Sequence, residues 1–241
     1  MNAGSSFITV LKEGARELGL SLNDIQVEKF LKYMAILKEW NEKMNLTAIE
    51  DDHDVVIKHF IDSLSILPYM ENKDDRLVDI GTGAGFPGIP VKIVYDSINV
   101  TLLDSLDKRI KFLNEVISAI ELKGIFAYHG RAEEYGAKQE FRENFDIATA
   151  RAVANLPVLL EYCLPFVKTG GYFIAMKGSN LEEVHNSQKA LKELGGEIQS
   201  IKELNLPFSD IKRNIIIIKK LRQTPTRYPR KAGKPSKEPL I

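Results

Sequence analysis

The 241-residue sequence has little cysteine, no excess of charge of either sign and no long apolar run. Its lone cysteine, Cys163, cannot form a disulfide within the chain, and no secretion signal opens the sequence, so a reducing, cytoplasmic setting is expected. Charge interrupts the apolar runs before the roughly 18 to 20 residues that a membrane-spanning helix needs. The 33 basic residues balance 33 acidic ones, so net charge alone does not indicate a polyanionic partner.

The composition is that of an ordinary globular protein, with 44% hydrophobic and 27% charged residues. The length allows one large core with a small appended piece. Charge is unevenly distributed, because basic residues and prolines alternate from Arg222 onward against a single acid, Glu238. We expect residues 222–241 to form an extended, cationic tail that is solvated.

The first third of the chain spaces its apolar residues as helices do. In its longest segment, Phe30, Tyr33 and Leu37 recur every three or four residues, the period of one helix face. Residues 45–47, Asn-Leu-Thr, are typical of a turn after it. The predicted helices are residues 7–18, 22–43 and 53–70. We therefore expect a small helical subdomain over residues 1–72.

From Arg76 the pattern changes to short apolar runs that alternate with amphipathic helices, as in a parallel sheet with helical crossovers. The predicted strands are residues 76–80, 99–104, 124–128, 145–150, 171–177, 197–203 and 213–219. The predicted helices are residues 87–95, 107–122, 156–167 and 181–194. No helical pattern separates the last two strands, which favours a closing antiparallel hairpin. The sequence predicts a doubly wound, Rossmann-like α/β domain over residues 73–221.

A glycine-rich turn, Gly81, Gly83 and Gly85, lies between the first of these strands and a helix. Closely spaced glycines let the backbone turn sharply and approach a ligand. Phe86 stands where a dinucleotide-binding turn has its third glycine, so the NAD pattern is missed. Asp79 would repel a pyrophosphate but suits a ligand that carries an ammonium and a sulfonium group. Asp79 and the turn therefore favour S-adenosylmethionine as the cofactor.

Two further acids extend this crevice. Asp104 ends the second strand about 20 residues beyond the turn, where a carboxylate accepts hydrogen bonds from ribose hydroxyls. After the third strand, residues 130–133 are placed for a loop over the adenine, which the backbone amides and Glu133 would contact. The spacing of the whole set, rather than any one member, predicts a methyltransferase domain.

The methyl acceptor is less well defined by the residues. The Asn/Asp-Pro-Pro-Tyr/Phe element used for exocyclic base amines is absent after the fourth strand, where residues 146–151 stand. Cys163 lies in an apolar helical stretch and is interpreted as a core residue rather than the thiolate that cytosine methylation needs. An acceptor with its own lone pair, such as a purine ring nitrogen, would need no catalytic base. The sequence is compatible with that acceptor but does not establish it.

The chain resembles the bacterial RsmG (also called GidB) methyltransferases, which methylate N7 of a guanine in small-subunit ribosomal RNA. The resemblance is carried by residues 40–47, 58–63, 79–90, 103–109, 131–134, 149–152 and 176–178. It implies that S-adenosylmethionine contacts Gly81, Phe86, Ala132, Glu133 and Arg151, with Asp104 on the ribose. It implies 16S ribosomal RNA as partner, free or within the small ribosomal subunit or its precursor, and no dedicated catalytic base.

Basic residues at strand ends, on helices and in the tail are candidates for RNA contact, as a hypothesis from charge and placement. Besides the tail, they are Lys43, His59, Lys108, Arg109, Arg131 and Lys177. For His59 a structural role is favoured over a catalytic one. No metal is expected, and we expect a monomer, although no residue pattern bears on the oligomeric state.

Three other functions compete with this interpretation. The first is a methyltransferase of the same fold that acts on a small molecule or a protein. The second is a nicotinamide-dependent oxidoreductase, which Phe86 and Asp79 disfavour. The third is a non-catalytic RNA-binding protein on a degenerate methyltransferase fold, which the intact glycine turn with Asp79 and Asp104 argues against.

Overall fold

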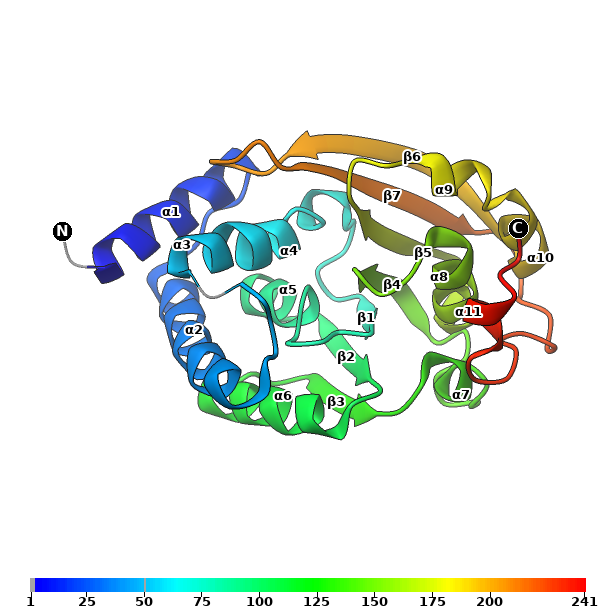
Figure 1. The fold of residues 1–241 in the computed structure, drawn as a ribbon, viewed down its shortest axis with the longest axis horizontal. Helices are drawn as coiled ribbons and strands as arrows, with labels where there is room; N and C mark the ends of the chain where they lie inside the picture. Colours follow the sequence, from blue (N-terminus) through cyan, green and yellow to red (C-terminus); the bar gives the residue numbers. More distant parts are fainter. Residues whose placement is uncertain (1–2, 50) are drawn as a thin grey trace.

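The computed structural model describes residues 3–49 and 51–241 and contains a seven-stranded sheet of order β3-β2-β1-β4-β5-β7-β6 (Figure 1). Strands β3, β2, β1, β4 and β5 are parallel, and β7 runs antiparallel to β5 and β6. The strands are β1 Arg76–Ile80, β2 Asn99–Asp104, β3 Ile125–His129, β4 Phe145–Arg151, β5 Val167–Lys177, β6 Gly196–Asn205 and β7 Lys212–Lys220. The predicted doubly wound α/β class and its closing hairpin are confirmed.

Helices cover both faces of the sheet (Figure 1). The α-helices are α1 Ala3–Glu17, α2 Asp24–Met44, α3 Asp52–Val55, α4 Asp62–Leu64, α5 Gly88–Val94, α6 Asp107–Ala119, α7 Ala132–Tyr135, α8 Leu156–Cys163, α9 Glu182–His185, α10 Gln188–Leu194 and α11 Lys234–Lys237. Among the described residues, no helix is both long enough and apolar enough to cross a membrane.

Neighbouring strand residues fill two separate cores, because side chains alternate across a strand. Leu77 packs with the cluster under α1, α2, α5 and α6, whereas Val78 packs with the cluster under α8 and α10. Ile215 and Ile216 of β7 divide between the two clusters in the same way. The near-continuous apolar runs of these strands therefore reflect burial on both faces, as in other doubly wound sheets.

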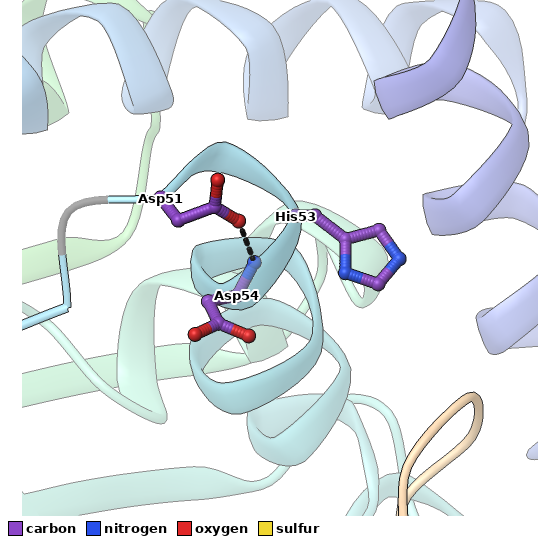
Figure 2. Close-up of side chains that lie close together, drawn as sticks. All are labelled: Asp51, His53 and Asp54. Carbon is purple, nitrogen blue, oxygen red and sulfur yellow. Dashed lines mark hydrogen bonds between the residues drawn. The ribbon is translucent and has the colours of Figure 1, made fainter.

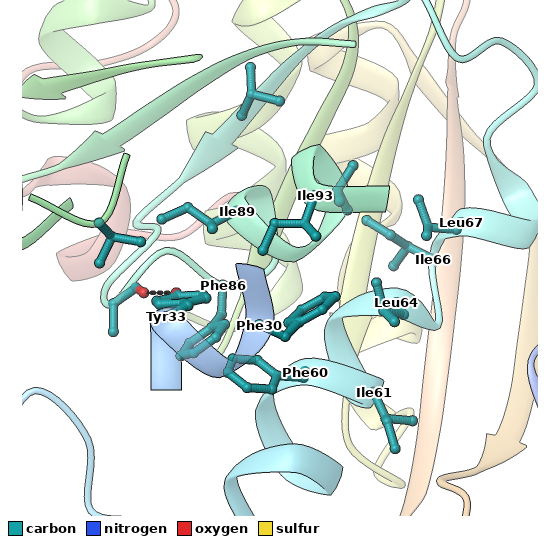
Figure 3. Close-up of a cluster of buried hydrophobic side chains, with 14 of the residues drawn as sticks. Phe30, Tyr33, Phe60, Ile61, Leu64, Ile66, Leu67, Phe86, Ile89 and Ile93 are labelled. Carbon is teal, nitrogen blue, oxygen red and sulfur yellow. Dashed lines mark hydrogen bonds between the residues drawn. The ribbon is translucent and has the colours of Figure 1, made fainter. Parts of the chain in front are cut away.

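The N-terminal helices share one core with the sheet rather than standing apart from it. Phe30 and Tyr33 of α2 both pack against Phe60, and Tyr33 also stacks on Phe86, the residue after the glycine turn (Figure 3). The Tyr33 hydroxyl donates a hydrogen bond to the carbonyl of Ala84 within that turn. Helix α2 therefore fixes the outer side of the glycine turn, and the division of the chain at residue 72 stays a prediction.

The third predicted helix, residues 53–70, is not continuous. Helix α3 passes into a π-helical segment, Val56–Ile61, then into α4, and a 3-10 turn follows at Leu67–Tyr69. A π-turn inserts one extra residue into a helix and shifts the side chains that follow it, often at functional sites. Here Lys58, His59 and Asp62 come to line one pocket.

The prediction of a solvated tail is wrong. Tyr228 is 5% exposed and Leu240 is 7% exposed, so both are buried. The backbone N–H and the guanidinium of Arg230 donate to Glu161 of α8. The cationic pattern looked unpaired in the sequence because its partner acid lies 69 residues earlier in the chain. Figure 1 shows this segment, drawn in red, against α7 and α8.

Candidate functional site

The glycine-rich turn joins β1 to α5 and closes against the end of β2. Gly81 and Gly83 have φ of +68° and +63°, a left-handed backbone that glycine adopts without strain. The Gly81 N–H donates to the Leu103 carbonyl at 2.8 Å, and the Gly83 N–H donates to Asp104 Oδ2 at 2.9 Å. A β carbon at Gly81 would lie 2.6 Å from a methyl carbon of Val153. The turn is therefore held tightly at the carboxyl edge of the sheet.

A pocket opens beside this turn, where β1, β2, β3 and β4 end, and we call it the loop pocket. Four of the predicted cofactor residues line it: Gly81, Asp104, Ala132 and Glu133. Apolar walls from Ile80, Leu103 and Val153 complete it. Apolar walls suit a planar base, and carboxylates accept hydrogen bonds from hydroxyl and amine groups, so these residues fit an adenosine-like ligand.

Asp104 lies in the wall of the loop pocket but is already hydrogen-bonded. Only 2% of the residue is exposed, and it accepts from the N–H groups of Leu106 and Gly83 and from Arg109 Nη1 at 3.1 Å. Among these three donors, only the Arg109 side chain can leave without a change of backbone. A ribose hydroxyl would therefore share the carboxylate with Arg109 or displace it.

Asp79 lies beneath the glycine turn and is not among the residues that line the loop pocket. Its Oδ2 accepts from the Thr82 hydroxyl at 2.7 Å and from the Gly88 N–H at 2.9 Å, at the start of α5. Its Oδ1 is buried and has no hydrogen-bond partner among the described residues. Burial raises the pKa of Asp79 to about 6. The free Oδ1 is the part of this carboxylate that remains available to a positively charged ligand.

A second pocket, which we call the basic pocket, lies where the π-helical segment meets the ends of β4 and β5 and the start of β7. Its lining includes four cations and one carboxylate: Lys58, Arg151, Lys177, Arg213 and Asp62. Asp62 is buried and accepts from Arg151 Nη1 at 2.8 Å and from Arg213 Nε at 3.0 Å. One buried carboxylate thus holds two guanidinium groups in place, and the pocket presents N–H donors to a ligand.

Arg151 and Phe86, which the resemblance assigns to the cofactor, do not line the loop pocket. The Arg151 guanidinium lies 5.0 Å from the centre of the Phe86 ring and donates to the carbonyl of Lys58 and to His59 Nδ1. Phe86 is buried and stacks on His59, with 4.6 Å between ring centres. Arg151 therefore lines the basic pocket, whereas Phe86 lies behind it, buried in the aromatic cluster and in contact with Arg151 and His59.

His59 is held in one tautomer by its neighbours. Arginine only donates hydrogen bonds, so Nδ1 accepts from Arg151 and Nε2 carries the proton that it donates to the Thr47 hydroxyl at 2.8 Å. Burial, reinforced by the charge of Arg151, lowers the pKa of His59 to about 3. The imidazole is therefore neutral at physiological pH, which agrees with a structural role.

The end of β4 separates the two pockets. Arg151 and Ala152 line the basic pocket, while the next two residues, Val153 and Ala154, line the loop pocket. Ala152 has a φ of +56°, an unusual conformation for a residue with a side chain, and such strain concentrates at functional sites. Lys177 Nζ of the basic pocket donates to the carbonyl of Ala154 at 2.9 Å. Groups bound in the two pockets would meet across these four residues.

The structure distributes the predicted RNA contacts over both pockets and the outer surface. His59 and Lys177 line the basic pocket, and Arg131 lines the loop pocket. Lys43 and Lys108 are exposed on α2 and α6, outside both pockets. Arg109 is paired with the carboxylate of Asp104, as described above.

Two other groups of chemically capable side chains lie apart from the pockets. Asp51, His53 and Asp54 gather at the start of α3, where Asp51 accepts from the Asp54 backbone N–H (Figure 2). Asp51 caps the helix through this bond, and Asp54 forms a partly exposed ion pair with Lys58 at 2.7 Å. Helix capping and surface pairing therefore account for the group. Cys163 is fully buried, and burial raises the pKa of its thiol, as expected for a core residue.

Sequence reasoning missed Asp62 and Arg213 as site residues. Asp62 lies inside the run 58–63 that carries the family resemblance, so a signal was present, but helical periodicity does not show which face a π-turn turns inward. Arg213 reaches Asp62 across 151 residues of sequence. A local sequence pattern cannot predict an ion pair between residues so far apart in the chain.

Comparisons with known proteins agree with this geometry. The family model of rRNA small subunit methyltransferase G matches residues 26–216. Ribosomal RNA small subunit methyltransferase G of Acetivibrio thermocellus is 65% identical over 96% of this chain and 96% of its own length. The protein of the same name from Alkaliphilus metalliredigens is 54% identical over 96% of this chain and 98% of its own length.

Solved structures of low identity confirm the fold. A SAM-dependent methyltransferase from Aquifex aeolicus superposes with a TM-score of 0.54 at 16% identity, over 72% of this chain and 96% of that chain. TrmN from Thermus thermophilus gives a TM-score of 0.52 at 14% identity, over 69% of this chain and 53% of that chain. The predicted resemblance is confirmed: the chain belongs to the rRNA small subunit methyltransferase G family.

Proposed function

We propose that this protein transfers the methyl group of S-adenosylmethionine to N7 of a guanine in 16S ribosomal RNA. The observation that carries the proposal is the pair of pockets that meet across residues 151–154, one with adenosine-like fit and one lined by cations. Family membership supports the substrate class, since the relatives are named for ribosomal RNA of the small subunit. A monomer in the cytoplasm is part of the same proposal, to be checked by light scattering and cell fractionation.

The loop pocket is assigned to the cofactor. S-adenosylmethionine, when bound, supplies a methyl group on a positively charged sulfur. Apolar side chains of the pocket would cover its adenine, and Asp104 would accept from its ribose hydroxyls. Gly81 and Gly83 keep side chains out of the space beside the turn. Asp79 contributes negative charge from beneath the turn, and a bound cation would favour its ionised form.

The basic pocket is assigned to the guanine and its phosphates. The O6 atom of guanine is an acceptor on the same edge of the base as N7, and arginine and lysine are its usual donors. A cation that donates to O6 leaves the N7 lone pair free for the methyl group. Arg151, Lys177 and Arg213 line the pocket, and Asp62 fixes the two guanidinium groups. The cations at a distance from the pockets, Lys43 and Lys108, would contact phosphates of the same RNA.

No proton transfer is required of the chain. Guanine N7 carries a lone pair in the plane of the base and no proton, so it attacks the methyl group directly. His59 is neutral, and with a pKa of about 3 it is a poor base. Catalysis therefore consists of alignment of the two reactants and exclusion of water. Alignment alone can lower a reaction barrier substantially, because it makes the step effectively unimolecular.

The test is transfer of a labelled methyl group from S-adenosylmethionine to small ribosomal subunits and to naked RNA from a strain that lacks the enzyme. Nucleoside mass spectrometry should find a single new 7-methylguanosine. The two RNA forms distinguish free RNA from the assembled particle as substrate. No transfer to either, with intact cofactor binding, would overturn the RNA acceptor and redirect the search to small molecules and proteins.

A further inference from the structure

The C-terminal segment lies against the folded domain, with α11 beside α8 in Figure 1, and its Ser236 lines the loop pocket. The start of the segment, just after β7, is fixed by Arg142, which lies between α7 and β4. Its guanidinium donates to the backbone carbonyls of Thr224 and Tyr228 at 2.6 and 2.8 Å. The Tyr228 side chain and Leu240 are buried against the cluster under α8. Residues 222–241 are therefore part of the folded domain.

A buried ion pair fixes the middle of this segment. Glu161 of α8 is fully buried and accepts from the backbone N–H of Arg230 at 2.8 Å and from its guanidinium at 2.9 and 2.6 Å. A buried carboxylate without its cation would be strongly destabilising, so this pair specifies where the segment docks. Arg227, three residues earlier, is 69% exposed at its side chain, pairs with Glu193 at 3.2 Å and lies 5.1 Å from the centre of the Tyr228 ring.

Three residues beyond the ion pair, the segment reaches the loop pocket. The Gly233 N–H donates to Glu133 Oε1 at 2.8 Å. The Ser236 hydroxyl is hydrogen-bonded to the Tyr162 hydroxyl at 2.7 Å, and both residues line the loop pocket together with Glu133. Among the described residues, Glu133 Oε2 has no hydrogen-bond partner. The backbone of the segment thus holds one oxygen of a pocket carboxylate and leaves the other free.

We propose that residues 228–236 are a strap that completes the cofactor pocket. The strap places Ser236 in the pocket wall and positions Glu133 through the Gly233 N–H, so that Oε2 accepts from the exocyclic amine of the cofactor's adenine. Arg230 is a positioning residue that acts through the docking of the strap. This inference rests on the proposed cofactor and assigns to residues 228–236 a role that their basic, proline-rich sequence does not suggest.

Calorimetric binding of S-adenosylhomocysteine to the full chain tests the strap. Arg230→Gln should weaken binding roughly tenfold or more, the scale of a lost charge-assisted hydrogen bond. The matched control is Arg227→Gln, in the same segment but at an exposed pair, which should stay within about twofold of the wild type. In a Glu133→Gln background, Arg230→Gln should have little further effect, because two changes that act through one contact are not additive.

A second ligand separates positioning from general destabilisation. S-inosylhomocysteine lacks the exocyclic amine, so the wild type should prefer the adenine ligand, and Arg230→Gln should reduce that preference. A loss of stability alone would weaken both ligands equally and leave the preference unchanged, which would overturn the inference. If Arg230→Gln fails to fold, Ser236→Ala decides instead: roughly threefold weaker binding supports the strap, and unchanged binding overturns it.

The wild-type titration distinguishes this inference from the proposed function. A wild type that does not bind S-adenosylhomocysteine would overturn both. A wild type that binds it, with equal affinities for Arg230→Gln and Arg227→Gln, would overturn the strap and leave the proposed function in place.

Discussion

The loop pocket and the basic pocket lie on either side of residues 151–154 but are lined by different kinds of groups. The loop pocket is made largely of backbone, short side chains and acids that accept backbone N–H groups. The basic pocket is made of long cationic side chains held by one buried acid, Asp62. The loop pocket therefore depends on backbone geometry, and the basic pocket depends on the balance of charge around Asp62. Substitutions that alter geometry should damage the loop pocket, and those that remove charge should damage the basic pocket.

Removal of the buried acid should have the largest effect. Asp62→Ala leaves the guanidinium groups of Arg151 and Arg213 without their carboxylate, so we expect a loss of about 3 kcal/mol in the free energy of unfolding, measured by denaturant titration. Methyl transfer should fall far more than cofactor affinity in the protein that remains folded. Asp54→Ala, which breaks an exposed pair with Lys58, is the control. A loss below about 1 kcal/mol would show that the basic pocket does not depend on Asp62.

Glycine substitutions should damage the loop pocket by geometry alone. Gly81→Ala adds backbone strain and a collision with Val153, and we expect at least a tenfold loss of cofactor affinity by calorimetry. Gly83→Ala is the matched control, because its φ is similar but its β carbon would meet nothing within 4 Å. Equal losses for both would mean that strain, and not the Val153 contact, limits this pocket.

His59 in the basic pocket and Asp79 beneath the glycine turn should change the stability of the fold in opposite directions as the pH falls. His59 has a folded-state pKa below its usual 6.5, so the unfolded chain binds its proton more readily and this group lowers stability as pH falls from 6.5 toward 3. Asp79 has a folded-state pKa raised from 3.8 to about 6, so its contribution to stability is lost as pH rises through that window. Unfolding midpoints between pH 4 and 8 should show a shallower acid loss for His59→Gln and a deeper one for Asp79→Asn. Profiles parallel to the wild type would contradict this assignment.

The smallest effect should come from the outer surface, away from both pockets. Lys108→Ala should weaken RNA binding slightly at every sequence and reduce the slope of log affinity against log salt by about 1, the effect of one phosphate contact. Arg109→Ala should also change cofactor affinity, because Arg109 is tied to Asp104 in the loop pocket. An unchanged salt slope for Lys108→Ala would remove this residue from the RNA contacts.

Local features of the fold were predictable from the sequence. The bounds of β1 and β2 agree with the predicted strands because each is a short, mostly apolar run that a turn follows, after Ile80 in β1 and after Asp104 in β2. The glycine spacing predicted a ligand-binding crevice at the turn. The loop pocket is lined by four of the residues predicted to bind the cofactor, Gly81, Asp104, Ala132 and Glu133. These signals are contained within a few residues, so a local pattern reports them.

Features that depend on distant partners were not predictable. The tail was interpreted as solvated because Glu161, its buried partner, is 69 residues away from Arg230. The π-turn that brings Asp62 to the basic pocket has no periodic signal in the sequence, and neither do the contacts of Arg151 with His59 and Phe86. The assignment of Phe86 and Arg151 to the cofactor stays a prediction from the resemblance. In each case the deciding contact joins segments that the sequence separates widely.

The contact between Tyr33 and the glycine turn has a consequence for how such enzymes diverge. Helix α2 holds the turn through the Tyr33 hydroxyl on Ala84 and the Tyr33 ring on Phe86. An exchange of the N-terminal helices for another set, as a route to a new RNA target, would release the turn on which the cofactor pocket is built. The helical region and the glycine turn must therefore change together. A chimeric protein that joins residues 1–72 of another family member to residues 73–241 of this chain should lose cofactor binding when the residue at position 33 no longer makes these contacts.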